Sequence, residues 1–253
     1  MHSVSHATVI IPARLRSTRL PEKMILSATG MPLVQHVVEQ VKRCTRVREI
    51  IVAADDQQIV DVLKPFGTRV VLTDPKHPTG TDRIAEVART ITGELIINVQ
   101  GDEPEIEPTT IDALIERMTQ TGSKMGTVVT PFASPHDPKD PNIVKAVLAV
   151  DGTALYFSRH AIPFHRDPAP DTSGPTYYHH LGIYGYRRDF LLEFAAWPPT
   201  PLERTEKLEQ LRALEHGIRI DTITIPTAAT GIDTPEQYAA FVQRRKNGRE
   251  GAK

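Results

Sequence analysis

The segment ATVIIPARLRSTRLPEK, residues 7–23, decides the fold because it joins a strongly apolar run to a basic loop. Its first five residues, ATVII, are apolar or β-branched. Such runs are typical of strands that lie in the middle of a parallel sheet and are buried on both faces. We therefore predict a central strand over residues 7–11, with a loop over residues 12–23 at its carboxyl end.

The segments that follow alternate between helix and strand patterns. Val34, Val37, Val38 and Val41 recur at helical spacing, which predicts an amphipathic helix over residues 32–42. Further strands are expected over residues 49–53, 68–72 and 95–99, and further helices over residues 57–63 and 81–91. This series predicts an α/β fold with a doubly wound, mostly parallel sheet.

The second half of the chain has a looser pattern. Strands are expected over residues 126–130, 143–150, 154–157, 182–186 and 219–225, and helices near residues 111–119, 201–216 and 235–244. Prolines favour a surface loop or lid over residues 163–176, and the polar residues 244–253 are expected to form a frayed end. We interpret residues 1–253 as a single α/β domain that carries a smaller β-rich lobe at about residues 132–190.

Composition excludes several classes of protein. Lys+Arg number 30 and Asp+Glu 31, so there is no global basic field to hold nucleic acid or an anionic membrane. The apolar stretch near the N-terminus is too short for a signal peptide or a membrane span, so neither export nor membrane insertion is expected. Cys44 is the single cysteine, which excludes an internal disulfide and fits a reducing cytoplasm.

The loop after the first strand carries four cations within ten positions, from Arg14 to Lys23. Ligands of open parallel sheets bind at the carboxyl ends of the strands, and a triphosphate there needs neutralisation by cations. Arginine can fork two phosphate oxygens, whereas lysine acts as a point charge. The alternative is a solvated basic loop. The position at a strand end favours a triphosphate site.

A second loop at a strand end, NVQGDEP over residues 98–104, is acidic. Mg²⁺ is usually held by one or two carboxylates together with phosphate oxygens and waters, which makes Asp102 a candidate metal ligand. Asp233, in the segment TGIDTP, also follows a strand and a glycine and is the candidate partner. Taken alone, Asp233 also fits the N-cap of the next helix, and the two roles are compatible.

Five sets of residues together resemble one known family along nearly the whole chain. They are residues 11–23 (IPARLRSTRLPEK), 80–86 (GTDRIAE), 98–104 (NVQGDEP), 180–186 (HLGIYGY), and 208–212 (LEQLR) with 231–236 (GIDTPE). The chain resembles the 3-deoxy-D-manno-octulosonate (Kdo) cytidylyltransferases, the CMP-Kdo synthetases of lipopolysaccharide assembly. The resemblance implies a Rossmann-like nucleotidyltransferase fold whose β-rich lobe serves dimerisation and sugar binding.

The resemblance also implies an activity and a set of site residues. CMP would pass from CTP to the anomeric hydroxyl of Kdo with release of pyrophosphate, in a cytoplasmic, Mg²⁺-dependent homodimer. The implied nucleotide-binding residues are Ala13, Arg14, Lys23, Gly80, Thr81 and Arg83. The implied sugar-binding residues are Gln100, His180, Tyr184 and Glu209, and the implied metal ligands are Asp102 and Asp233; of these, Arg14, Lys23, Asp102 and Asp233 are the implied catalytic residues.

Three positions depart from the family pattern. Met24 stands where proline is usual, His179 where arginine is usual, and Gln237 where an acid is common. Because residue 179 adjoins the implied sugar pocket, a related acidic sugar such as an amino-substituted Kdo is an alternative acceptor. Without the resemblance, His180 and Tyr184 read as packing residues, and Glu209 reads as one more solvated charge.

Two other classes of protein compete with this interpretation. An acidic pair after a strand also occurs in metal-dependent glycosyltransferases, although the loop over residues 14–23 favours an intact triphosphate. A non-catalytic nucleotide-sensing module is the third possibility, and such a module would not need both Asp102 and Asp233. The sequence contains neither GxxxxGK[ST] nor GxGxxG, which disfavours P-loop ATPases and dinucleotide dehydrogenases.

Overall fold

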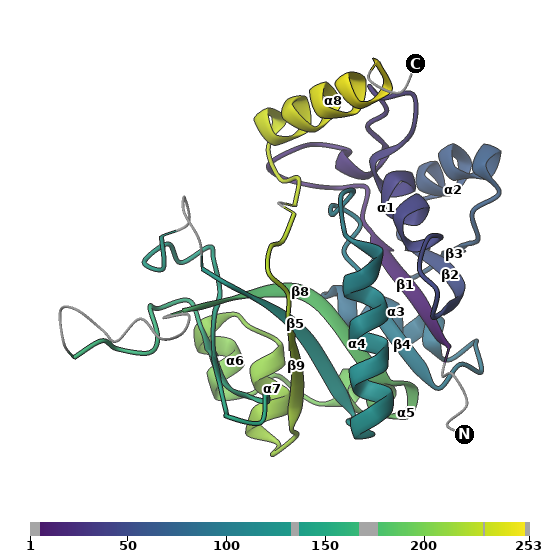
Figure 1. The fold of residues 1–253 in the computed structure, drawn as a ribbon. Helices are drawn as coiled ribbons and strands as arrows, with labels where there is room; N and C mark the ends of the chain where they lie inside the picture. Colours follow the sequence, from purple (N-terminus) through teal and green to yellow (C-terminus); the bar gives the residue numbers. More distant parts are fainter. Residues whose placement is uncertain (1–5, 133–136, 167–176, 230, 251–253) are drawn as a thin grey trace.

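The computed structural model describes residues 6–132, 137–166, 177–229 and 231–250. The first half forms a regular strand and helix series (Figure 1). Its elements are β1 (Ala7–Ala13), the 3₁₀ helix η1 (Lys23–Ile25), α1 (Leu33–Val41), β2 (Val47–Ala54), α2 (Gln57–Leu63), the 3₁₀ helix η2 (Lys64–Phe66), β3 (Val70–Leu72), α3 (Gly80–Ala88) and β4 (Leu95–Asn98). Each helix and strand predicted from residues 7–99 is present, with ends that differ by a few residues.

The second half adds the remaining strands and helices. They are α4 (Pro108–Thr121), β5 (Met125–Pro131), β6 (Lys145–Leu148), β7 (Ala154–Ser158), β8 (Tyr178–Arg187), α5 (Arg188–Ala196), α6 (Pro201–Glu206), α7 (Gln210–Glu215), β9 (Ile220–Thr224) and α8 (Pro235–Glu250). Among the described residues, no helix combines the length and apolar character that a membrane span requires.

The strands form one sheet in the order β3-β2-β1-β4-β8-β5-β9. Strand β8 is antiparallel to its neighbours β4 and β5, whereas the other neighbouring pairs along this path are parallel. The prediction of a mostly parallel sheet is therefore confirmed. Strands β6 and β7 extend the same sheet, because Lys145 of β6 pairs with His179 at the start of β8.

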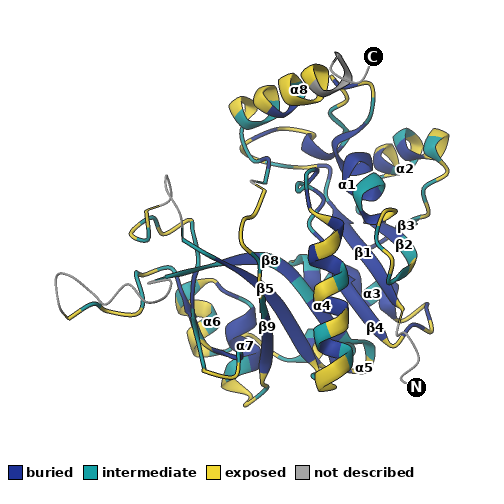
Figure 2. Cartoon of the chain, viewed as in Figure 1, coloured by how far each residue is buried: buried dark blue, intermediate teal, exposed yellow. Residues whose placement is uncertain are grey.

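Helices cover both faces of the sheet. Along β1, Val9 and Ile11 point into a cluster with α1, α2 and α4, whereas Ile10 points into a cluster with α3, α5 and α7. This alternation explains why the predicted first strand is apolar at every position, since both of its faces are covered. Figure 2 shows the strands buried and the outer face of α4 exposed.

Three elements differ from the predictions. The helix expected over residues 201–216 is two helices, because α6 ends at Glu206 and the next residue, Lys207, has a left-handed φ of 54° that cannot continue a helix. The expected frayed end is wrong for residues 244–250, since α8 continues to Glu250 and Arg244 pairs with Glu105, whereas residues 251–253 lie outside the described residues. Helix α5 was not predicted, although Phe190, Leu191 and Phe194 have helical spacing and are buried.

The expected loop over residues 163–176 is described only in part. Residues 167–176 lie outside the described residues, and residues 163–166 form neither helix nor strand. Part of the expected lobe, residues 133–136, also lies outside them.

Helix α8 closes the carboxyl-end side of the sheet. Figure 1 shows it beside α1, at the end of a long connection from β9. Phe241 of α8 packs with Leu20, Leu33 and Ile232, and its ring meets that of His36 edge-on at 5.0 Å. The C-terminal segment is thereby fixed against the loop that follows β1.

We expect Gly185→Ala to lower the free energy of unfolding by about 1–3 kcal/mol, because overpacking strains a dense core. A Cβ atom at Gly185 would lie 2.2 Å from Met118 Sδ and 3.2 Å from Ile97 Cδ1. Gly182→Ala in the same strand is the matched control, since its Cβ would lie 3.6 Å from Gln100 Cγ. Urea unfolding measures both variants, and equal midpoints would contradict this account of the packing.

Candidate active site

The loops that follow β1 and β4 lie against each other. A Cβ atom at Gly101 would lie 2.9 Å from Met24 Sδ and 3.1 Å from the Pro12 carbonyl oxygen. A glycine at this position therefore lets the acidic loop approach the basic loop closely. The two loops predicted to carry the chemistry meet at the carboxyl edge of the sheet, where ligands of open α/β folds bind.

Lys23, at the start of η1, lies between the two predicted metal carboxylates. Its Nζ is 2.6 Å from Asp102 Oδ2 and 2.8 Å from Asp233 Oδ1. Burial alone would lower the pKa of Lys23, but the charges and hydrogen bonds of both aspartates outweigh burial and raise it. Lys23 is therefore charged, and the carboxylates are close enough for a single cation to contact both.

Contacts of the preceding residue, Ile232, hold Asp233 beside Asp102. The N–H of Ile232 donates to the Asp102 carbonyl at 2.8 Å, and the Ile232 side chain is buried beneath α8. Arg19 in the basic loop also pairs with Asp233, with Nη2 2.9 Å from Oδ2. The N-cap role considered for Asp233 belongs to Thr234, whose Oγ1 accepts from Gln237 N at 3.3 Å.

The donor set decides which metal fits. Within the described ranges, no group of three or more His, Cys, Asp or Glu side chains gathers to hold a metal. Two carboxylates beside a basic loop have the donor chemistry that Mg²⁺ prefers, because Mg²⁺ keeps waters and phosphate oxygens in its shell. The residues present therefore fit Mg²⁺, and the role of Asp102 and Asp233 as its ligands stays a prediction.

The other expected nucleotide-binding residues gather beside Pro12. Arg14 Nη2 donates to the His77 carbonyl at 3.2 Å, and a Cβ atom at Gly80 would lie 3.6 Å from Pro12 Cγ. The Ala13 carbonyl accepts from Asp55 N, and Asp55 Oδ1 accepts from Leu15 N at 2.8 Å. The loop after β1 and the start of α3 therefore line one side of the site together.

Arg83 is placed differently from its neighbours. Its side chain has no exposed surface, its Nη1 donates to Thr73 Oγ1 at 2.5 Å, and its Nη2 lies 3.7 Å from Asp55 Oδ2. Burial lowers the pKa of Arg83, although the charge of Asp55 opposes this effect. In this geometry Arg83 contacts the loops that follow β2 and β3, and its direct contact with a nucleotide stays a prediction.

Three of the four expected sugar residues come from β8 and the end of β4. Gln100 Nε2 donates to the Gly182 carbonyl at 3.3 Å, and the rings of His180 and Tyr184 lie 5.4 Å apart. Burial is the main cause that raises the pKa of Tyr184. These side chains therefore form a polar and aromatic wall beside the acidic loop.

Glu209 joins the nucleotide and sugar sides. Its carboxylate accepts a hydrogen bond from Thr81 Oγ1, next to Gly80 in α3. Burial raises the pKa of Glu209, while the bond from Thr81 and the charge of Arg212 lower it. Arg212 is itself held by Glu203 through two hydrogen bonds of 2.7 and 2.6 Å. Glu209 is thus a positioned group, in contrast to the solvated charge considered above.

The hydrogen bonds of His180 identify its tautomer. Thr127 Oγ1 donates to the Ile183 carbonyl at 2.8 Å, so it accepts from His180 Nε2 at 2.9 Å. The Nε2 atom carries the proton, and Nδ1 is an acceptor. Burial, assisted by the charge of His179, lowers the pKa of His180 to about 3. His180 is therefore a neutral imidazole at physiological pH.

Sequence reasoning missed two residues that the structure places here. Arg19 lies within the basic loop but was not separated from its neighbours, and Asp55 holds that loop through Leu15 N. Asp55 directly follows β2, so the rule that sites lie at the carboxyl ends of strands was a signal that could have found it.

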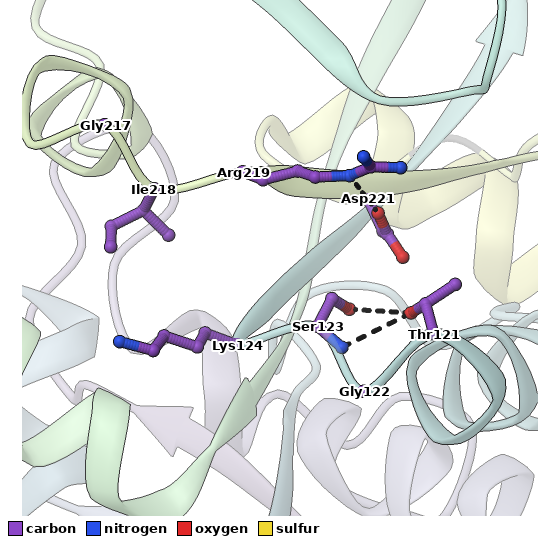
Figure 3. A pocket seen from close by; sticks show the side chains of 8 residues that line it. All are labelled: Thr121, Gly122, Ser123, Lys124, Gly217, Ile218, Arg219 and Asp221. Atoms are coloured by element: carbon purple, nitrogen blue, oxygen red, sulfur yellow. Dashed lines mark hydrogen bonds and ion pairs between the residues drawn. The ribbon is translucent and has the colours of Figure 1, made fainter.

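A separate pocket lies at the opposite edge of the sheet. Figure 3 shows it where the turns before β5 and β9 meet, with Lys124 and Arg219 among its lining residues. Its volume is about 650 Å³. Asp221 at its base pairs with Arg219 at 3.4 Å. The pocket lies at the amino ends of these strands, away from the predicted site residues.

Comparisons with known proteins place the chain among cytidylyltransferases. The family model described as cytidylyltransferase matches residues 8–220. A 3-deoxy-manno-octulosonate cytidylyltransferase of Geobacter sulfurreducens is 47% identical and covers 94% of this chain and 99% of its own length. The enzyme of that name from Geobacter metallireducens is 46% identical, with 94% of this chain and 96% of its own length covered.

Solved structures show the same likeness. CMP:2-keto-3-deoxy-manno-octonic acid synthetase complexed with CTP superposes with a TM-score of 0.88 at 35% identity and covers 98% of this chain and all of its own. A Bacillus anthracis structure described as a glucose-1-phosphate thymidylyltransferase has a TM-score of 0.66 at 15% identity and covers 94% of this chain and 95% of its own. This second likeness concerns the fold alone.

The buried His180 makes stability depend on pH. Its folded pKa of about 3 lies below the unfolded value of 6.5, so the unfolded state binds more protons between these values and stability falls as pH falls below 6.5. From pH 7 to pH 5 the wild type should lose about 2 kcal/mol more than His180→Gln. Urea unfolding at both pH values tests this, and equal losses would show that His180 is not held neutral.

Proposed function

We infer that the chain, which belongs to the 3-deoxy-manno-octulosonate cytidylyltransferase family, transfers CMP from CTP to the anomeric hydroxyl of Kdo and releases pyrophosphate. The relatives of this name and the synthetase solved with CTP match the chain along nearly their whole length. The structural observation that carries the proposal is the bridge of Lys23 between Asp102 and Asp233 beside a basic loop. The product serves lipopolysaccharide biosynthesis.

The loop after β1 receives the triphosphate. Arg14 and Lys23 stand at its two ends, and Ser17 and Thr18 between them add hydroxyl donors. Forked hydrogen bonds from arginine and the point charge of lysine neutralise phosphate oxygens in complementary ways. Ala13, Gly80 and Thr81 line the neighbouring wall and seat the nucleoside, while Arg83 holds that wall from beneath.

Asp102 and Asp233 hold Mg²⁺ when the nucleotide binds. Their carboxylates already share one cation in Lys23 Nζ, so they would also hold a divalent ion, and Lys23 would then be available to pair with phosphate. A bound Mg²⁺ supplies charge neutralisation at the phosphates and lowers the pKa of the attacking hydroxyl. Arg19, paired with Asp233, lies where it can follow the leaving pyrophosphate.

The sugar binds against β8 and α7. Gln100, Tyr184 and Glu209 offer hydrogen-bonding groups, and the neutral His180 offers Nδ1 as an acceptor for a hydroxyl. These side chains orient the anomeric oxygen in line with the α-phosphorus, so that positioning and charge neutralisation carry the rate. No side chain here is assigned as a general base.

Further features support finer proposals. As the family resemblance implies, we expect the β-rich half, which includes the β6–β7 hairpin, to form a homodimer that light scattering would detect. The reaction is expected in the cytoplasm, where CTP is made. An amino-substituted Kdo remains the alternative acceptor. The reason is His179, which stands where the family usually has arginine and directly precedes the proposed sugar residue His180 in β8.

Pyrophosphate release tests the reaction directly. With CTP, Mg²⁺ and a panel of acidic sugars, we expect release that needs Kdo, stops with EDTA and fails with ATP, GTP or UTP. Release with amino-substituted Kdo alone would keep the mechanism but change the acceptor. No release with any pairing would contradict the proposed function.

Asp102→Asn should lower kcat by about 10²–10³-fold or more, because it removes a carboxylate that would hold the metal ion next to the transferring phosphate. Folding should change little, since Lys23 keeps Asp233 as a partner. Asp189→Asn is the matched control, because that carboxylate is 95% exposed on α5. Steady-state kinetics and thermal unfolding measure both, and a near-normal rate would refute the metal role.

A further inference from the structure

We propose that Gln237 is a positioning residue that fixes Asp233 for metal binding. This inference rests on the proposed function, in which Asp102 and Asp233 hold Mg²⁺. Gln237 Oε1 accepts from two consecutive main-chain groups, Asp233 N at 2.7 Å and Thr234 N at 3.0 Å. One amide oxygen therefore holds the two main-chain N–H groups on either side of the Asp233 Cα atom, from which the carboxylate side chain extends.

The arrangement goes beyond an ordinary helix cap. In a capping box, the N-cap hydroxyl accepts from the N3 main chain and the N3 side chain accepts from the N-cap main chain. Thr234 and Gln237 make both of these bonds. The additional bond to Asp233 N is shorter than either of them, and it reaches the residue before the cap. The capping box of α8 is complete without that extra bond, and the extra bond acts on the main chain of Asp233 instead.

Asp233 needs support from its main chain because its side-chain partners, Arg19 and Lys23, belong to the basic loop proposed to bind the triphosphate. Lys23 and Arg19 both pair with it, and both are cations that a triphosphate attracts. When they turn towards phosphate, the bonds from Asp233 N to Gln237 and from Ile232 N to the Asp102 carbonyl continue to hold the segment. The carboxylate then stays beside Asp102.

Gln237 is anchored on a rigid element. Phe241, one turn along α8, is fully buried, and the Tyr238 hydroxyl accepts from Ala28 N at 2.9 Å. By contrast, the described residues between β9 and α8 form neither helix nor strand. Helix α8 is thus fixed in place, and Gln237 ties the main chain of Asp233 to it.

Groups that orient a metal ligand typically contribute 10–100-fold to metal affinity. Gln237→Met keeps the length of the side chain but removes the acceptor oxygen. Gln237→Glu keeps an oxygen that accepts from both N–H groups, so it should rescue the geometry. Gln243→Met is the matched control, because Gln243 lies on the same helix, is exposed and contacts Asn247 instead of the site.

The experiment titrates Mn²⁺ into each full-length variant in the presence of a non-hydrolysable CTP analogue, by calorimetry. Thermal unfolding selects a temperature at which all variants are folded. We expect Gln237→Met to raise the Kd for Mn²⁺ roughly 10–100-fold. Gln237→Glu should bind at least as tightly as the wild type, and Gln243→Met should match it. In turnover, the Mg²⁺ concentration for half-maximal rate should rise for Gln237→Met while the KM for Kdo stays unchanged.

Each other outcome overturns the inference. A wild-type Kd for Gln237→Met would show that Asp233 is positioned without Gln237. Weak binding by Gln237→Glu as well would show that the acceptor oxygen is not the cause. If the wild type itself bound no Mn²⁺, the metal site in the proposed function would fail together with the inference, whereas normal wild-type binding isolates the failure to Gln237.

Discussion

The ammonium of Lys23 between Asp102 and Asp233 is the interaction on which the rest of the site depends. The three residues are far apart in the chain: Asp102 lies 79 positions after Lys23, and Asp233 lies 210 positions after it. The carboxylates of Asp102 and Asp233 both lie within 2.8 Å of Lys23 Nζ, and the positive charge of Lys23 offsets the repulsion between them. The parallel sheet brings the first two together, and α8 brings the third.

The same constraint explains features that look unrelated at first. Gly101 lets the acidic loop touch the basic loop, and the buried cluster around Phe241 holds the C-terminal segment beside them. Thr81 and Glu209 join the wall proposed for the nucleotide to the wall proposed for the sugar through one hydrogen bond. A ligand that moves either residue therefore acts on both parts of the site, which suits a reaction that needs two substrates in line.

The sequence predicted the strands, the parallel sheet and the two charged loops because these depend on local patterns of apolar and charged residues. The burial of Arg83 could not be predicted, since it depends on Thr73 and Asp55 from other elements. The break at Lys207 was hidden because a left-handed residue other than glycine leaves no clear signal. The tautomer of His180 likewise depends on Thr127, which only the pairing of β5 with β8 brings into contact.

The most direct test of the account is a crystal structure with CTP and Mn²⁺, in which anomalous scattering locates the metal. The account predicts that Mn²⁺ lies between Asp102 and Asp233 and that Lys23 Nζ has moved to a phosphate oxygen. Metal bound elsewhere, with Lys23 still between the two carboxylates, would contradict it.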